Sequence, residues 1–253
     1  MCTLAVFRGI SARFPLVVAA NRDEFLDRPS SPPSRLESLP EVVAGLDLEA
    51  SGTWLGMRVD GPLLIAGLLN RRSSGLPPPQ GKRSRGLLCL DVLAGRTIAA
   101  TAASLDAAVA ARYAPFNLFI ADARRAVVID NAKGVGLTEL EEGLSVLTNL
   151  DVNDPRCIRL ASAVPRFEAV AALLASRPDI ALSDLLSGLA TVMGDHSASC
   201  EPGGEDPLAR LCVHTPDFGT RSASILVVSE EDERRYFHAD GPPCRSSFIE
   251  VNY

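Results

Sequence analysis

The chain has 253 residues, of which 47% are hydrophobic and 22% are charged, as in a globular protein with one large domain or two small ones. Its formal net charge of -6 and the lack of a basic stripe in the sequence argue against nucleic-acid binding. No apolar run approaches the ~20 residues of a membrane-spanning helix, and the N-terminal segment lacks the pattern of a signal peptide, so we expect a cytoplasmic protein without a membrane span.

The first predicted element is an apolar, β-prone strand over residues 2–7 that begins with Cys2. The initiator methionine is usually removed when such a small residue follows it. Removal would leave Cys2 with an α-amine, which titrates near ~7.7–8.0, beside a thiol that titrates near ~8.5. The amine could then take the thiol proton without a histidine. A cysteine at the head of a strand can equally be a small buried hydrophobe.

A second apolar strand over residues 16–20 runs into the polar tetrad Asn21-Arg22-Asp23-Glu24. Polar residues at the end of a buried strand lie where a rigid sheet can present them to a pocket. The alternative is a charged turn without a ligand, and the spacing does not separate the two interpretations.

The Pro- and Ser-rich segment 28–40 is expected to be a loop, followed by a short strand at 42–44. Two strands, 53–59 and 63–69, flank the turn Asp60-Gly61-Pro62 and predict a β-hairpin whose second strand ends on Asn70. The segment 71–86 is long for a structureless connection, which favours a lid or entrance loop.

The middle of the chain predicts helices, then strands, then helices again, and the end predicts strands. The Ala- and Thr-rich stretch between the first two helices is expected to connect them, and Asp154 to cap a helical stretch that Pro155 opens. The predicted helices cover 87–94, 105–113, 161–175 and 180–193; the predicted strands cover 116–120, 126–129, 134–140, 144–147, 211–214, 222–229, 234–238 and 247–251. This order, without an internal repeat or a linker, predicts a single α+β domain over residues 1–253 with layered sheets.

Several of the predicted apolar strands begin or end at a polar residue that could act on an acyl group. These residues are Cys2, Asn21 with Asp23, Asn70, Asn149 and Arg221. A thiolate can attack a carbonyl, amide groups can stabilise the oxyanion, and an arginine can lower a thiol pKa or bind an anionic substrate group. No spacing rule predicts that these regions converge.

Four segments of the chain resemble the NRDE family, which is also called transport and Golgi organisation 2. They are Met1-Cys2-Thr3, the Asn21-Arg22-Asp23-Glu24 tetrad, Gly52-Thr53-Trp54-Leu55-Gly56 and Phe218-Gly219-Thr220-Arg221-Ser222. Phe116-Asn117-Leu118 is similar to a family pattern as well. The resemblance covers nearly the whole chain. Members of this family are associated with haem movement and with lipid or acyl-CoA balance.

The chain is also distantly similar to the cysteine branch of the N-terminal nucleophile hydrolases, which includes bile-salt hydrolases and penicillin V acylases. This resemblance implies a four-layer αββα sandwich with mostly antiparallel sheets, and it implies Cys2 as the nucleophile. It assigns catalytic roles to Asp23, Asn149 and Arg221. The substrate-binding candidates are Asn21, Arg22 and Asn70, although the strand before Asn70 carries one Leu more than the hydrolase pattern.

We expect no metal site and no cofactor. The six cysteines include no C-x-x-C pair and are expected to be free thiols. Metal ligation by His196, Cys200, Cys212 and His214 is conceivable, but their spacing fits no zinc pattern well, which favours ordinary polar residues. His238, in an alternating strand, is expected to be a surface or core histidine.

Two functions follow from these observations. The first is a cysteine hydrolase or acyl-transfer enzyme that acts on a small non-peptide amide or acyl compound. The alternative is a non-enzymatic haem or acyl-lipid carrier on the same fold. The retained Cys2 favours the enzyme, and the lack of a Cys-Pro haem motif in the sequence weakens the carrier.

Overall fold

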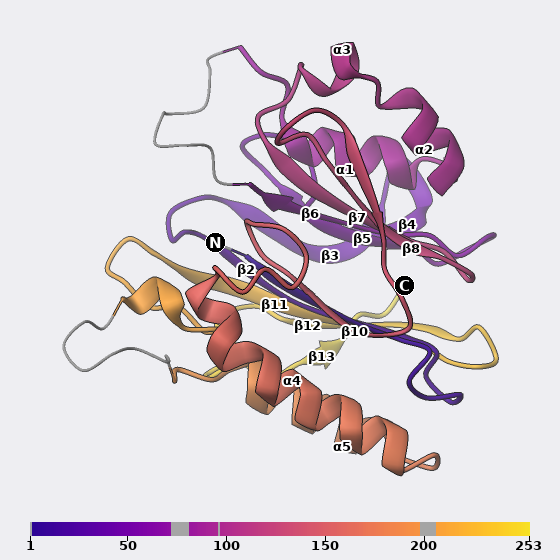
Figure 1. Cartoon of the computed structure of the whole chain (residues 1–253), viewed down its shortest axis with the longest axis vertical. Coiled ribbons are helices and arrows are strands. Elements are labelled where there is room, and N and C mark those ends of the chain that lie inside the picture. Colours follow the sequence, from indigo (N-terminus) through magenta and orange to yellow (C-terminus); the bar gives the residue numbers. More distant parts are fainter. Residues whose placement is uncertain (1, 72–80, 96, 198–205) are drawn as a thin grey trace. The chain divides into compact units, whose positions relative to one another are not determined.

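The computed structural model describes residues 2–71, 81–95, 97–197 and 206–253, and they form two compact units (Figure 1). Unit 1 comprises the chain up to Asp27 together with Glu141–Val251. Unit 2 comprises Arg28–Leu140 and the last two residues. Each unit contains one β-sheet with its own helices, and every strand pair described is antiparallel. A single domain over residues 1–253 stays a prediction.

The sheet of unit 1 has six strands in the order β10-β1-β2-β11-β12-β13. The strands are β1 (Thr3–Arg8), β2 (Leu16–Phe25), β10 (Gly143–Leu147), β11 (Phe218–Val228), β12 (Arg234–Ala239) and β13 (Ile249–Glu250). Two helices, α4 (Ile158–Ser176) and α5 (Leu182–Met193), and a short 3-10 turn, η1 (Pro207–Ala209), complete the unit. The N-terminal strand thus lies in the interior of the sheet, between β10 and β2.

Helices α4 and α5 cover one face of this sheet, because every second strand residue packs against their apolar stripes (Figure 1). Ala5 and Phe7 of β1 belong to the same buried cluster as Ala163 and Phe167 of α4. The rings of Phe7 and Phe167 meet edge to face at a centroid distance of 6.1 Å. Odd-numbered residues of β1 and β2 therefore face the helices.

The sheet of unit 2 has seven strands in the order β3-β4-β5-β6-β7-β8-β9. They are β3 (Ser30–Leu36), β4 (Leu39–Asp47), β5 (Leu55–Arg58), β6 (Ile65–Asn70), β7 (Phe116–Ala121), β8 (Ala126–Asp130) and β9 (Gly136–Glu139). Its helices are α1 (Arg85–Leu93), α2 (Ile98–Ser104) and α3 (Ala107–Ala110). Apolar residues of α1 and α2 share a core with β4, β6, β7 and β8.

The structure confirms most of the elements expected from periodicity. The predicted hairpin around Asp60-Gly61-Pro62 is β5 and β6, and the predicted strand pair 116–120 and 126–129 is β7 and β8. His238 is a core residue whose Nδ1 lies 3.0 Å from the Ser224 hydroxyl. The five cysteines that the structure describes are free thiols.

The expected loop over residues 28–40 was wrong, because most of it forms β3. Pro32 and Pro33 misled the prediction, since proline cannot donate to a β-ladder. They are tolerated here because β3 is the edge strand of its sheet and its pairing is irregular between Ser31 and Ser34.

Four other expected elements or boundaries were wrong as well. The Ala- and Thr-rich connection is helix α2, capped by the Thr97 hydroxyl, and the helix expected over 105–113 is reduced to α3. Helix α4 begins at Ile158, because Asp154 pairs with Arg156 instead of capping a helix at Pro155. Residues 211–214 form one isolated bridge, between His214 and Gly219, rather than a strand. The lid expected over 71–86 falls mainly outside the described residues.

Among the described residues, no helix combines the length and the apolar character needed to cross a membrane.

Gly52, in the motif around Trp54, is required for close packing against helix α1. A Cβ atom at this position would lie 2.4 Å from the carbonyl carbon of Gly86. We expect Gly52→Ala to destabilise unit 2 by about 1–3 kcal/mol, as overpacking does. Urea unfolding followed by the fluorescence of Trp54, the single tryptophan, would measure the change.

Gly188 in α5 provides the matched control. The nearest atom to a Cβ there is 3.8 Å away, so Gly188→Ala should stabilise the helix by about 0.5–1 kcal/mol. The two changes in unfolding free energy need not be equal in size. A Gly52→Ala variant that is more stable than the wild type would contradict the close approach of Gly52 to Gly86.

Candidate functional site

The candidate site lies at the N-terminal end of β1, where Cys2 precedes the first paired residue. Strand β1 pairs Thr3 with Asn21 of β2, and on its other side Leu4 with Leu147 of β10. When both registers are continued to Cys2, Arg22 lies opposite it on one side and Asn149 on the other. Adjacent strands are ~4.8 Å apart, which brings Arg22 beside Cys2, whereas β10 ends at Leu147 and the chain bends at Asn149.

Cys2 is half-buried as a residue, and its thiol donates a long hydrogen bond to the main-chain carbonyl of Asp23, with 3.7 Å between Sγ and O. Burial of the thiol and the negative charge of Asp23 raise the pKa of Cys2, whereas the positive charge of Arg22 lowers it. The net shift is upward. The thiol is therefore protonated at neutral pH, and a nucleophilic role for Cys2 requires a base.

The Asp23 carboxylate forms a fully buried ion pair with Arg159 of α4. Arg159 Nη1 lies 2.7 Å from Asp23 Oδ2, and both side chains are 0% exposed. The other carboxylate oxygen accepts a hydrogen bond of 2.7 Å from the Thr220 hydroxyl. Desolvating two charges is costly, and these hydrogen bonds to the charged groups offset part of that cost.

The same guanidinium also reaches the residue next to Cys2. Arg159 Nη1 donates to the Thr3 hydroxyl at 3.0 Å, and Nη2 donates to the carbonyl of Leu208 in η1 at 2.9 Å. Arg159 thus connects β1, β2 and the segment before β11. It fixes the start of β1, and with it the position of Cys2.

Arg159 was absent from the residues proposed from the sequence, although a signal for it exists. It lies on the apolar face of α4, one and two helical turns before Ala163 and Phe167, which are both buried. A charged residue on the apolar face of a helix needs a buried partner of opposite charge. The sequence does not show that this partner is Asp23, which lies 136 residues away.

Successive residues of β2 point to opposite faces of the sheet, so Asn21 and Asp23 lie on one face and Arg22 on the other. Asn21 and Asp23 point toward the helices, while Arg22, opposite Cys2, points to the other face of the sheet. The Asn21 side-chain amide donates to the carbonyls of Met193 and Leu211, at 2.9 and 3.0 Å. These contacts give Asn21 a structural role. Its substrate-binding role, like that of Arg22, stays a prediction.

Asn149 and Arg221 each contain a buried polar atom that the fold does not use. Among the described residues, Asn149 Oδ1 and Arg221 Nε have no hydrogen-bond partner. Arg221 lies at an irregularity in the pairing of β11 with β2, between Thr220 and Ser222. Buried polar atoms without partners are rare and costly, which makes both residues candidates for contact with a ligand.

Asn70 ends β6 in unit 2 and is exposed. Its predicted part in substrate binding stays a prediction.

The charge of Arg22 provides a test of the electrostatics around Cys2. We expect Arg22→Gln to raise the pKa of the Cys2 thiol and to slow its alkylation by iodoacetamide at neutral pH, because a nearby positive charge favours the thiolate. Arg22→Lys keeps the charge and is the matched control. Mass-spectrometric mapping of Cys2 over time gives the rates.

The sequence had suggested Arg221 for this role. Equal slowing in Arg221→Gln, with no effect of Arg22→Gln, would favour that assignment instead.

The buried ion pair provides a second test. Replacing only Asp23 with Leu, or only Arg159 with Met, leaves an unpaired buried charge and should cost about 3–5 kcal/mol of unfolding free energy. The double variant should lose less than the sum of the two. Urea unfolding followed by circular dichroism measures all three. Additive losses would contradict a direct pair, and a soluble double variant beside insoluble single variants would support it.

The fold is similar to that of a solved structure, an N-acylethanolamine-hydrolyzing acid amidase ortholog from Caenorhabditis elegans. The TM-score is 0.52 at 13% sequence identity, and the match covers 99% of this chain and 100% of that one. This confirms the expected α+β class with antiparallel sheets and the N-terminal nucleophile hydrolase type of fold.

Comparison of sequences identifies the family. Residues 1–240 match the family described as Transport and Golgi organisation 2. The Transport and Golgi organization protein 2 homolog of Bos taurus is 29% identical over 244 residues, which is 86% of this chain and 83% of that protein. The human homolog is 27% identical over 250 residues, with the same coverage of 86% and 83%. The chain therefore belongs to the Transport and Golgi organisation 2 family.

Proposed function

We propose that this chain is a cysteine-nucleophile hydrolase or acyl-transfer enzyme for a small non-peptide amide or acyl compound. The observation that carries the proposal is the position of Cys2, a half-buried residue at the start of an interior strand, where its neighbour Thr3 is held by Arg159. A reactive group needs such rigid support, because a misplacement of about 1 Å costs much of the rate.

The base in this proposal is the α-amine of Cys2 after removal of Met1. The amine takes the proton of the thiol, and the thiolate sulfur forms a bond to the carbonyl carbon of the substrate. The C–N bond of an amide then breaks, and the leaving nitrogen receives the proton held by the amine. Water, or a second acceptor in a transfer reaction, attacks the thioester, which releases the acyl group and restores the thiol.

In this proposal Asn149, Arg22 and Arg221 supply the groups that the reaction needs beyond a nucleophile. The side-chain amide of Asn149, opposite Cys2 in the continued register, can donate a hydrogen bond to the oxyanion. Its buried Oδ1, which has no partner among the described residues, could accept a hydrogen bond from an N–H of the substrate. Arg22 or Arg221 can bind an anionic group of the substrate. Asp23 acts in this scheme as a positioning residue, through Thr3 and Arg159.

The class of substrate rests on a similarity in fold. The solved structure with this fold is named as an amidase that hydrolyses N-acylethanolamines. An amide or other acyl compound is therefore the class to test first on this chain, with the fold similarity as analogy rather than as proof of activity.

A trapped acyl-enzyme would test the nucleophile directly. We expect a panel of N-acyl amides and acyl thioesters to leave an acyl group on Cys2, detected by peptide mass spectrometry after rapid acid quenching. Cys2→Ala should abolish both the adduct and turnover. Cys89→Ala, which removes a buried thiol of helix α1, is the matched control and should keep them.

Asn149→Ala should lower turnover by ~10²–10³, as the loss of one oxyanion donor does, while the rate of Cys2 alkylation changes little. Retention of Met1 in the intact mass of the purified protein would overturn the mechanism. If the protein bound haem or an acyl chain and turned over none of the substrates, the carrier function would be favoured over the enzyme.

A further inference from the structure

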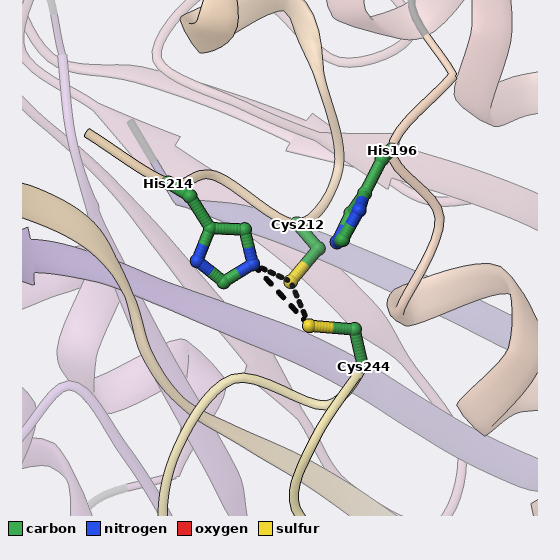
Figure 2. A group of neighbouring side chains, drawn as sticks. All are labelled: His196, Cys212, His214 and Cys244. Atoms are coloured by element: carbon green, nitrogen blue, oxygen red, sulfur yellow. Dashed lines mark hydrogen bonds between the residues drawn. The ribbon is translucent and has the colours of Figure 1, made fainter.

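Four potential metal ligands from three separate segments of unit 1 converge beside the strand that carries Asp23. His196 follows the end of α5, Cys212 and His214 precede β11, and Cys244 lies in the turn after β12. Their ligand atoms all lie within 4.8 Å of one another, and Figure 2 shows the side chains directed toward a common point. The proposed reaction at Cys2 uses none of them.

The distances among three of the four residues, Cys212, His214 and Cys244, are those of a tetrahedral zinc site. With Zn–S bonds of ~2.3 Å and Zn–N bonds of ~2.0–2.1 Å, two sulfur ligands lie about 3.7 Å apart, and a sulfur and a nitrogen ligand about 3.6 Å apart. The two sulfurs, of Cys212 and Cys244, are 3.6 Å apart. His214 Nε2 lies 3.6 Å from Cys212 Sγ and 3.3 Å from Cys244 Sγ.

His196 is the candidate for the fourth ligand, with its ligand atom within 4.8 Å of the other three. Its ring lies nearly perpendicular to that of His214, with a centroid distance of 5.0 Å and an angle of 84° between the planes. His196 is exposed and Cys212 is buried, so the cluster has one side open to solvent through which an ion can arrive. Two sulfur and two nitrogen ligands form the donor set typical of structural zinc.

The main chain holds these segments together, so the cluster is built in advance. The N–H of Cys212 donates to the carbonyl of Asp195 at 3.0 Å. Gly194, at the end of α5, lies close to the backbone of Cys244. A Cβ atom on residue 194 would be 3.3 Å from the Cα atom of Cys244. The turn that presents Cys244 is closed by hydrogen bonds from Arg245 and Ser246 to the carbonyl of Pro242.

We propose that His196, Cys212, His214 and Cys244 bind one Zn²⁺ ion as a closed structural site. Binding converts the two thiols to thiolates and releases two protons, and the two negative charges neutralise the ion. Four protein ligands leave no open position for substrate or water, so the site stabilises unit 1 and does not take part in the reaction.

Hydrogen bonds connect this zinc site to the buried ion pair. The N–H of Val213, between two of the ligands, donates to the Thr220 hydroxyl at 2.9 Å. The same hydroxyl donates to Asp23 Oδ1 at 2.7 Å. Asn21 bonds the carbonyl of Leu211, next to Cys212. Zinc would therefore stabilise the segments that hold the end of β2 in place.

A disulfide between Cys212 and Cys244 is the competing chemistry. It would use only two of the four residues, and it requires an oxidant and a sulfur–sulfur distance of ~2.05 Å. The convergence of both histidines on the two sulfurs favours the metal.

The test uses the reduced full-length protein, with bound metal measured by elemental analysis and by the visible absorption of a cobalt(II)-substituted sample. We expect one zinc per chain and the intense absorption of tetrahedral cobalt with thiolate ligands. Cys212→Ser and Cys244→Ser should lose both. His196→Gln removes an exposed ligand without disturbing the core. Loss of a residue that only supports a metal ligand already weakens metal binding ~10-fold or more, so loss of the ligand itself should weaken cobalt binding at least ~10-fold.

Two control variants separate this proposal from the proposed function. Cys89→Ala keeps the site while removing another thiol, and Cys2→Ala removes the candidate nucleophile; both should bind zinc and cobalt as the wild type does. A chelator should lower the melting temperature of the wild type but not that of Cys244→Ser. Absence of stoichiometric metal from the reduced protein would overturn the zinc site, as would unchanged cobalt binding in His196→Gln.

Discussion

The structure around Cys2 depends on the buried ion pair between Asp23 and Arg159. Neither side chain has access to water, so each charge is stabilised only by its partner and by hydrogen bonds from the surrounding chain. Through this pair, α4 is joined to β2, and through the Thr3 hydroxyl the same arginine is joined to β1. A charge that cannot be left unpaired is a strong constraint on how these three elements pack.

This constraint acts on one face of the sheet, while Cys2 and Arg22, which are candidates for contact with a ligand, belong to the other face. Asp23, Asn21 and Thr3 face the helices, where their polar atoms bind the chain itself. Cys2 and Arg22 alternate with them and point away. One short stretch of sequence can therefore hold both the rigid support of a site and the groups that would act on a ligand, because alternation separates the two sets.

The cluster of His196, Cys212, His214 and Cys244 could fix the positions of loops, as the ion pair fixes the positions of β1, β2 and α4. Loops have few backbone hydrogen bonds of their own, and those at the end of α5 and before β11 lie next to the support of Cys2. A metal ion that joins three such segments would supply the constraint that a small number of apolar contacts cannot. Thr220 is the point where the cluster and the ion pair meet, since its hydroxyl contacts both.

The sequence by itself determined the features that arise from local patterns. Alternating and continuous apolar runs predicted β1, the hairpin of β5 and β6, and the bodies of α4 and α5. Motifs around Cys2, Asn21 and Trp54 predicted the family, and the comparison with residues 1–240 confirmed it. These properties depend on residues near one another in the chain, so they can be read without the fold.

Only the tertiary structure decided which distant residues meet. The partner of Asp23 lies 136 residues away in a helix, and Cys244 lies 32 residues after Cys212, outside any motif spacing. The strand β3 is possible despite two prolines because it is at an edge, a position that the local sequence does not reveal. Pairing between distant residues depends on how whole helices and strands pack. Local patterns in the sequence report only on neighbouring residues, so they do not show which distant residues meet.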